Sequence, residues 1–261
     1  MPANATSSRV LVITPTYNEA GNLEETVAAV FAAAPDVDLL IVDDSSPDGT
    51  GEIADRLAAA DSRVTVLHRT GKGGLGRAYV AGFGLALERS YDVVVQMDAD
   101  GSHPADALPD LLATLAADPK VGLVIGSRWV PGGSLVDWAV GRRVLSRAGN
   151  AYARAMLRLG VRDVTAGYRA YRADVLRGLP LADIDSRGYC FQIDMTLRTV
   201  EAGWRIVERP IEFRERTSGS SKMSKAIVVE AMWRVTVWGL FRPVGPAAGV
   251  SRRTRGATAE N

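Results

Sequence analysis

Short apolar runs alternate with helix-like segments along the first half of the chain. Runs with the length and composition of buried strands stand at 10–14, 39–42, 64–67, 92–97 and 121–125. The helix-like segments between and after them end near residues 34, 60, 89 and 117. Strands that alternate with helices in this order predict an α/β fold, in which a mostly parallel sheet is covered by helices on both faces.

Polar clusters follow three of these apolar runs directly. They are Pro15–Glu19, Asp43–Asp48 and Asp98–Ser102. In a parallel sheet the carboxyl ends of the strands meet at one edge, and ligands bind beyond that edge. We therefore expect the three clusters to converge on one pocket.

Composition indicates an ordinary globular chain. Of its 261 residues, 47% are hydrophobic and 23% are charged, which excludes a disordered or collagen-like protein. The single cysteine, Cys190, cannot form an internal disulfide and favours a reducing compartment. No run of about 18 uncharged apolar residues occurs, so we expect no segment to cross a bilayer. Residues 1–8 do not have the charged and apolar regions of a signal peptide.

The two halves of the chain differ in charge, although the whole chain carries a formal net charge of only +1. Residues 1–125 have 8 Lys and Arg against 18 Asp and Glu, whereas residues 126–261 have 23 against 12. An acidic half suits a metal ion or sugar hydroxyls, and a basic half suits phosphates or an anionic membrane surface. The alternative is two solvated surfaces that attract each other.

Asp98-Ala99-Asp100 places two carboxylates at the end of an apolar strand, where both can face one ligand. Hard divalent cations such as Mg²⁺ bind one or two carboxylates together with substrate phosphates. Alternatively, Asp100 or Ser102 caps the helix that starts near Pro104. The two other polar clusters at the same edge favour the metal site. For His103, packing within its loop is favoured over a role as base or ligand.

The first two clusters have the chemistry of a nucleoside pocket. The ring of Tyr17 can stack on a base, and the carboxylates of Glu19 and Asp43-Asp44 can accept hydrogen bonds from a base or a ribose. The simpler alternatives are a turn before a helix capped by Asn22, and an Asx turn. The turn does not account for Tyr17 and Glu19, and the Asx turn suits Asp48-Gly49 better than Asp43-Asp44.

Four motifs together resemble a known family. They are Pro15-Thr16-Tyr17-Asn18-Glu19, Val42-Asp43-Asp44-Ser45-Ser46-Pro47-Asp48-Gly49-Thr50, Asp98-Ala99-Asp100 with His103-Pro104, and Gly126-Ser127-Arg128. In this order they resemble the family 2 inverting glycosyltransferases and, more narrowly, the dolichol-phosphate mannosyltransferases, also called polyprenol monophosphomannose synthases. The resemblance extends from about Val10 to Phe241. It implies a GT-A fold, GDP-mannose as donor, a polyprenyl monophosphate as acceptor, and a divalent cation, Mg²⁺ or Mn²⁺, as cofactor.

The resemblance also implies roles for individual residues, carried over by motif. For nucleotide-sugar binding it indicates Pro15, Tyr17, Glu19, Val42, Asp44, Asp98, Ala99, Asp100, Arg128, Gln192, Arg216 and Lys222. For metal binding it indicates Asp98, Asp100 and Ser102, although the family often has a longer Gln where Ser102 stands. For catalysis it indicates Asp98, Asp100 and Arg216.

The basic half supplies the candidates for binding the lipid phosphate. By the same resemblance these are Arg128, Arg142, Ser221 and Lys222, and the stretch from Arg216 to Lys222 is similar to the family's flexible acceptor loop. Arginine forms bidentate hydrogen bonds with phosphate oxygens, and lysine adds a point charge. For most of the 27 arginines, a surface charge is the simpler interpretation.

We expect one GT-A domain over residues 1–243, with a nucleotide-binding half at about 9–126, an acceptor half at about 127–243 and a flexible basic tail at 244–261. Residues 223–241 predict an apolar helix, interpreted either as an amphipathic helix in a membrane interface or as a helix packed on the sheet. The expected location is the cytoplasm, peripherally on the cytoplasmic face of a membrane. The lipid surface or a membrane-protein partner would hold the chain there, and no nucleic acid is expected as a partner.

The implied reaction needs no general base, because the phosphate oxygens of the acceptor are already ionised near neutral pH. Direct attack inverts the anomeric carbon, so an α-linked donor gives a β-linked product. Two other functions stay open: glucosyl transfer from UDP-glucose to the same acceptor, and a non-catalytic nucleotide-binding module that recruits a membrane partner. A dinucleotide oxidoreductase is disfavoured, because the glycine-rich stretch Gly71–Gly76 does not follow the first strand.

Overall fold

The computed structural model describes residues 8–184, 188–215 and 225–241. Its strands are β1 (Val10–Thr16), β2 (Asp38–Asp43), β3 (Val64–His68), β4 (Val93–Gln96), β5 (Val121–Ser127), β6 (Ser134–Val136), β7 (Arg169–Arg172), β8 (Arg205–Pro210) and β9 (Glu212–Arg214). Its α-helices are α1 (Leu23–Ala33), α2 (Thr50–Ala60), α3 (Leu75–Glu88), α4 (Leu108–Ala116), α5 (Val140–Leu157), α6 (Ala173–Arg177), α7 (Tyr189–Glu201) and α8 (Lys225–Phe241). Short 3₁₀ turns lie at η1 (Ala105–Ala107) and η2 (Leu181–Asp183).

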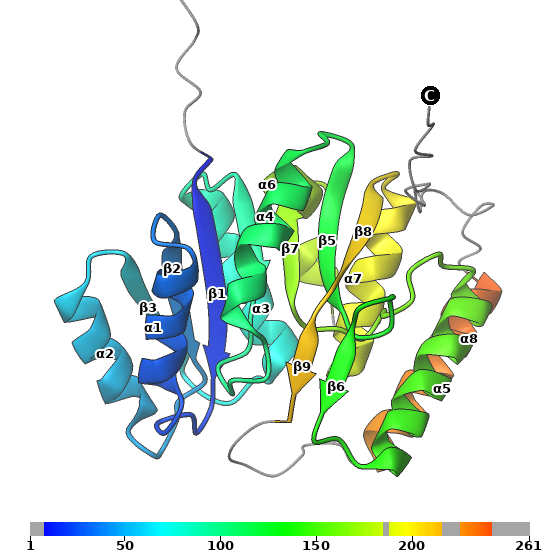
Figure 1. Cartoon of the computed structure of the whole chain (residues 1–261), viewed down its shortest axis with the longest axis horizontal. Coiled ribbons are helices and arrows are strands. Elements are labelled where there is room, and N and C mark those ends of the chain that lie inside the picture. Colours follow the sequence, from blue (N-terminus) through cyan, green and yellow to red (C-terminus); the bar gives the residue numbers. More distant parts are fainter. Residues whose placement is uncertain (1–7, 185–187, 216–224, 242–261) are drawn as a thin grey trace, which may run out of the picture.

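Seven strands form the main sheet, in the order β3-β2-β1-β4-β7-β5-β8 (Figure 1). Neighbouring strands are parallel except at β7, which runs antiparallel to both β4 and β5. Strands β6 and β9 form a separate parallel pair. The predicted α/β fold with a mostly parallel sheet is confirmed, and strands from both halves of the chain join the same sheet.

Alternating side chains divide the core between the two faces of the sheet. On β1, Leu11 and Ile13 belong to one apolar cluster, and Val12 belongs to the other. Helices α3, α5, α6, α7 and α8 contribute to the first cluster, and α1, α2 and α4 contribute to the second. This two-residue period is typical of strands that are buried on both faces.

The sequence does not predict strand β7, because residues 169–172 read Arg-Ala-Tyr-Arg and form no apolar run. Arg169 is nevertheless fully buried. Its guanidinium donates to the carbonyl oxygens of Val164 and Ala166 and to the hydroxyl of Thr196, at 2.9, 2.7 and 3.0 Å. Hydrogen bonds of this kind offset the cost of burying a charged group, so a central strand can carry an arginine.

Strand β1 continues through Pro15 to Thr16, two residues beyond its predicted end. Proline cannot donate to a ladder and is usually excluded from central strands. Here β1 stops pairing with β4 at Ile13 but pairs with β2 as far as Thr16. Successive residues of a parallel strand bond to opposite neighbours, so Pro15 lies on the side where β4 has already ended. The extra residues carry β1 to the rim where ligands are expected.

Helices α5 and α8 lie side by side, at the right in Figure 1. Their backbones approach closely at Gly239, where an added Cβ atom would lie 2.6 Å from the carbonyl oxygen of Met156. On α8, Val235 is buried, whereas Met232 and Trp233 are exposed. The expected amphipathic character of this helix is therefore wrong, because apolar residues face both the protein and the surface. Within the described ranges, no helix combines the length and the apolarity needed to cross a membrane.

Candidate active site

The polar clusters after β1, β2 and β4 are joined by hydrogen bonds at the carboxyl edge of the sheet. The backbone N–H of Asp44 donates to the carbonyl oxygen of Thr16 at 3.0 Å, which ties the second cluster to the first. The hydroxyl of Thr26, on α1, donates to the carbonyl oxygen of Ala99 at 3.0 Å. The three loops therefore share one rim, as their positions in the sequence lead one to expect.

Asp43 and Asp48 stabilise their own turns. The carboxylate of Asp43 accepts the hydroxyl proton of Thr16 at 3.0 Å and the backbone N–H of Ser46 at 3.1 Å. The carboxylate of Asp48 accepts the N–H and the hydroxyl proton of Thr50 at 3.1 and 2.5 Å. These hydrogen bonds lower the pKa of Asp48 although burial opposes the shift. The Asx-turn interpretation thus holds for Asp48, which bonds the N–H two residues on, whereas Asp43 bonds the N–H three residues on. Both carboxylates serve their own loops, which leaves Asp44 as the pocket carboxylate.

Asp44 contacts the loop that follows β3. One of its carboxylate oxygens pairs with Arg69, and the other accepts the N–H groups of Gly73 and Gly74 at 3.1 and 3.0 Å. The same loop holds the ammonium nitrogen of Lys72 3.7 Å from the ring centroid of Tyr17, a cation–π contact. Sequence analysis missed this loop as part of the site. A lysine between glycines directly after a strand was the available signal.

The remaining residues of the first two motifs fill supporting positions. Val42 is fully buried in β2, and Pro15 is half-buried at the end of β1. Glu19 accepts a hydrogen bond from the side-chain amide of Asn22 at 2.9 Å. Asn22 makes no side-chain capping bond to α1, so the capping role expected for it is wrong. Its amide instead orients the carboxylate of Glu19.

Asp98 is held by two neighbours. Its Oδ1 accepts the hydroxyl proton of Tyr79 at 2.8 Å, and its backbone N–H donates to Nδ1 of His103 at 3.0 Å. The imidazole of His103 stacks on the ring of Tyr168, with centroids 5.1 Å apart, and meets Phe213 edge-on. Burial, reinforced by Asp98, raises the pKa of Tyr79, so its hydroxyl stays a proton donor. His103 packs within its loop, as the favoured interpretation has it.

Asp100 and Ser102 form a compact turn next to Asp98. Both are buried, and the N–H of Ser102 donates to Oδ1 of Asp100 at 3.1 Å. Within the described ranges, no group of three or more His, Cys, Asp or Glu side chains is placed to hold a metal ion. A pair of carboxylates suits Mg²⁺ or Mn²⁺ when substrate phosphates supply further oxygen ligands. The donor set therefore fits a cation that binds together with a nucleoside diphosphate.

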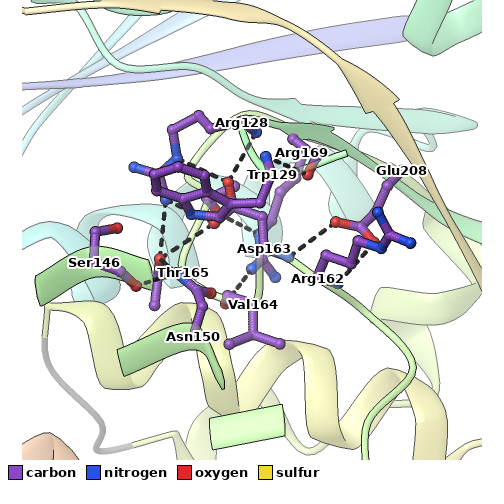
Figure 2. Close-up of polar contacts among 12 residues, drawn as sticks. Arg128, Trp129, Ser146, Asn150, Arg162, Asp163, Val164, Thr165, Arg169 and Glu208 are labelled. Carbon is purple, nitrogen blue, oxygen red and sulfur yellow. Dashed lines mark hydrogen bonds and ion pairs between the residues drawn. The ribbon is translucent and has the colours of Figure 1, made fainter. Parts of the chain in front are cut away.

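Arg128 is engaged in a buried, bidentate ion pair (Figure 2). Its Nε and Nη2 donate to the two carboxylate oxygens of Asp163 at 2.8 and 2.7 Å, and Nη2 also reaches the hydroxyl of Thr165 at 3.0 Å. The Arg128 side chain is 6% exposed and that of Asp163 is fully buried. The rings of Trp138 and Phe213 lie 5.6 and 5.3 Å from the guanidinium carbon. The guanidinium of Arg128 thus binds a protein carboxylate, and sequence analysis did not predict this partner.

A second layer of hydrogen bonds supports this ion pair (Figure 2). The backbone N–H groups of Arg162 and Asp163 donate to Glu208 on β8 at 2.7 and 2.9 Å. Burial raises the pKa of Glu208, although these hydrogen bonds oppose the shift. The side-chain amide of Asn150, on α5, donates to Thr165 at 3.1 Å. The loop that carries Asp163 is thus fixed from β8 on one side and from α5 on the other.

Arg142 lies at the start of α5 and packs on the ring of Trp138. Its guanidinium carbon is 4.0 Å from the Trp138 ring centroid, and its Nη1 donates to Glu215 at 2.5 Å. Arg128 and Arg142 both line a cavity of about 280 Å³. Its other walls are mostly apolar and come from α5, α7 and α8, including Leu145, Tyr152, Ala153, Ile193, Met232 and Val235.

Gln192, on α7, is the remaining candidate within the described residues. It is 3% exposed, and neither atom of its side-chain amide has a hydrogen-bond partner among those residues. Buried polar groups almost always have partners, so this amide is suited to a polar ligand. Three further candidates, Arg216, Ser221 and Lys222, lie outside the described residues.

The chain is similar to known sequences over most of its length. It is 58% identical over 233 residues to the undecaprenyl-phosphate mannosyltransferase of Micrococcus luteus, covering 89% of this chain and 94% of that protein. It is 52% identical over 247 residues to the polyprenol monophosphomannose synthase of Mycolicibacterium smegmatis, covering 94% of this chain and 92% of that protein.

The fold is also similar to solved structures. One is a mannosyltransferase from Pyrobaculum calidifontis in complex with GDP-Man and Mn²⁺, with a TM-score of 0.55, 20% identity and coverage of 91% of this chain and 71% of that chain. Another is the glucosyl-3-phosphoglycerate synthase from Mycobacterium tuberculosis with Mn²⁺, UDP and its product, with a TM-score of 0.61, 21% identity and coverage of 92% and 81%. Residues 11–179 match the family described as glycosyl transferase family 2, and on this evidence the chain belongs to that family.

Proposed function

We propose that this protein transfers mannose from GDP-mannose to a polyprenyl monophosphate, with inversion at the anomeric carbon. Mannose transfer to a lipid phosphate is the activity named for relatives that are 58% and 52% identical to this chain. The structural observation that carries the proposal is the cavity lined by Arg128 and Arg142. Its walls are otherwise mostly apolar, which matches an acceptor with an anionic head and a hydrocarbon chain.

The donor nucleoside would bind between Tyr17 and Asp44. The half-buried ring of Tyr17 can stack on the base, and the Asp44 carboxylate is already oriented by Arg69 and the backbone of residues 73–74. A carboxylate can accept two neighbouring N–H groups of guanine at once, which suits GDP. The Pyrobaculum calidifontis enzyme, which shares this fold, was crystallised with GDP-Man and Mn²⁺.

Asp98 and Asp100 would hold the cation together with the diphosphate. Bound there, a divalent cation supplies positive charge to the departing GDP, where negative charge builds as the sugar bond breaks. The two aspartates fix its position at the rim, since Asp98 is oriented by Tyr79 and Asp100 by the backbone of Ser102. Gln192 and Ala99 would contact the sugar side of the donor, as the family resemblance implies.

The acceptor phosphate would approach from the α5 side. Arg142 is the more exposed of the two arginines, with 19% of its side chain exposed, and its guanidinium can exchange Glu215 for a phosphate oxygen. The charge of Arg128 is balanced by Asp163, so Arg128 would help to shape the phosphate site without adding net charge. Arg142, once released from Glu215, would offset the repulsion between the acceptor phosphate and the donor diphosphate. An ionised phosphate oxygen can then attack the anomeric carbon directly, and an α-linked donor gives a β-linked product.

Peripheral binding to a membrane, as we propose it, is supported by the exposed residues of α5 and α8. Val140 and Val144 on α5 and Trp233, Leu240 and Phe241 on α8 are all at least 60% exposed. Large apolar side chains gathered on one pair of helices are typical of a surface that contacts a membrane or a partner. The same two helices line the cavity, so a lipid could enter it from the bilayer.

The test is transfer of labelled mannose from GDP-mannose to a short polyprenyl phosphate in the presence of Mg²⁺ or Mn²⁺. We expect label in the organic phase, and little label when UDP-glucose replaces GDP-mannose. The Arg142→Ala variant should raise the KM for the lipid phosphate by about tenfold, because it loses one charge-assisted hydrogen bond. The KM for GDP-mannose should change less. Wild-type protein that leaves all label in the aqueous phase would overturn the proposal and favour the non-catalytic module.

A further inference from the structure

Tyr79 reaches Asp98 from the core beneath the rim. It lies on α3, its side chain is fully buried, and its ring is stacked parallel to that of Phe191 on α7, with centroids 6.1 Å apart and an interplanar angle of 4°. Its hydroxyl donates to Oδ1 of Asp98 at 2.8 Å. Because packing fixes the ring, the hydroxyl oxygen has a fixed position and holds one oxygen of the carboxylate.

One further contact holds the same aspartate. Its backbone N–H donates to Nδ1 of His103. Asp98 is therefore held at Oδ1 by Tyr79 and at its backbone by His103.

Packing alone does not call for a hydroxyl at position 79. A phenylalanine would fill the same space between Phe83 and Phe191 and would need no hydrogen-bond partner. The hydroxyl of a buried tyrosine usually has a hydrogen-bond partner, and here that partner is a carboxylate of the candidate donor site. The hydroxyl thus acts on Asp98. It adds nothing to the packing of the core, because an apolar ring would fill the same space.

We propose that Tyr79 is a positioning residue of the donor site, whose hydroxyl holds the Asp98 carboxylate in the orientation that engages the cation bound with the diphosphate. The proposal rests on the proposed function, because it takes Asp98 to bind the donor. A carboxylate that is oriented before the ligand arrives loses less conformational freedom on binding, which tightens binding. Loss of the hydroxyl would leave the core packed and free the carboxylate to rotate.

The experiment compares Tyr79→Phe with a matched control, Tyr91→Phe. Tyr91 is also buried, and its hydroxyl donates to the carboxylate of Asp38 at 2.7 Å. This pair lies at the amino ends of the strands, whereas the candidate site lies at their carboxyl ends. The measurements are the Kd for GDP with Mn²⁺, the Kd for GDP in EDTA, and the free energy of unfolding. We expect Tyr79→Phe to raise the Kd for GDP with Mn²⁺ by about tenfold, which corresponds to the loss of one hydrogen bond to a charged group. The Kd for GDP in EDTA should stay within about twofold of the wild-type value.

The two variants should lose similar stability, and Tyr91→Phe should leave both Kd values unchanged. A second measurement repeats Tyr79→Phe in an Asp98→Asn background. If Tyr79 acts through Asp98, the tenfold effect disappears there, whereas a purely structural role would give the same effect in both backgrounds.

The outcomes separate this proposal from the proposed function. Mn²⁺-dependent GDP binding that is the same in wild type and Tyr79→Phe would overturn the role of Tyr79 and leave the function intact. An equal rise of Kd in EDTA and in Mn²⁺ would also overturn it, because the loss would then be general. Wild-type protein that binds GDP no more tightly with Mn²⁺ than in EDTA would overturn the donor site itself and the role of Tyr79 with it.

Discussion

The turn that carries Asp100, at the acidic rim, and the basic region around α5 hold their side chains by different kinds of contact. In the loop after β4, Asp100 accepts a hydrogen bond from the backbone two residues away. In the basic region, Arg128 pairs with Asp163 and Arg142 with Glu215, partners 35 and 73 residues away. The Asp100 turn is closed by a neighbouring residue, whereas the ion pairs of the basic region form only when distant segments meet. Substitutions should therefore affect chemistry in the first region and stability in the second.

The largest expected effect is that of Asp100→Ala on turnover. Loss of a carboxylate that holds the cation should lower kcat by about a thousandfold, equivalent to ~4 kcal/mol of transition-state stabilisation. The free energy of unfolding should fall by only about 1 kcal/mol, because one backbone N–H loses its partner. Labelled mannose transfer and chemical denaturation measure the two quantities. Asp106→Ala, on the exposed turn nearby, is the control and should keep its activity. Turnover near the wild-type value in Asp100→Ala would remove the metal role.

The next effect in size is that of Asp163→Asn on stability. This change leaves the buried Arg128 without a counter-charge, and breaking such a pair costs about 3 kcal/mol. Asp174→Asn breaks the exposed pair with Arg177 and should cost less than about 1 kcal/mol. Urea denaturation of both variants measures the difference. Equal losses of stability in the two variants would mean that the basic region does not depend on its buried ion pair. The expected difference from the Asp100 turn would then be wrong.

The smallest expected effect concerns the outer face of α8. Trp233→Ser removes a ring that is 69% exposed, so stability should change by less than about 0.5 kcal/mol. Binding to vesicles with anionic lipids should weaken by about tenfold, since burying a large apolar side chain is worth about 1.5 kcal/mol or more. Leu75→Ser, an exposed apolar residue on α3, is the matched control. Co-sedimentation with vesicles measures both variants, and equal binding by the two would argue against α8 as the membrane-facing helix.

Much of the acidic rim could be predicted because strand ends and motif residues coincide in the sequence. The parallel strands and the loops at 15–19, 43–48 and 98–102 follow from local patterns alone. The roles of Asp43 and Asp44 could not be separated in the same way, because the difference lies in the loop at 69–74, whose Arg69, Gly73 and Gly74 contact the carboxylate of Asp44.

Contacts between distant segments explain what the sequence could not show. Nothing in the local pattern marks Tyr79 as the partner of Asp98, because a tyrosine on the buried face of a helix is usually a packing residue. The partner of Arg128 was hidden for the same reason. The cavity between α5 and α8 depends on two helices that are far apart in the sequence, at Val140–Leu157 and Lys225–Phe241. Strand β7 was missed because it carries two arginines, and charged residues are not expected in a central strand of a sheet.

The position of β7 has a consequence for how the polypeptide can be divided. In the sheet, β5 has only β7 and β8 as neighbours, and both follow residue 168. A fragment that stops at residue 126 would leave β5 with both edges unpaired and one edge of β4 open, which favours aggregation over folding. Translation must therefore reach β8, which ends at Pro210, before all seven strands of the main sheet can pair. Proteolytic nicking between the halves would yield pieces that work only while they stay associated, and not two transplantable modules.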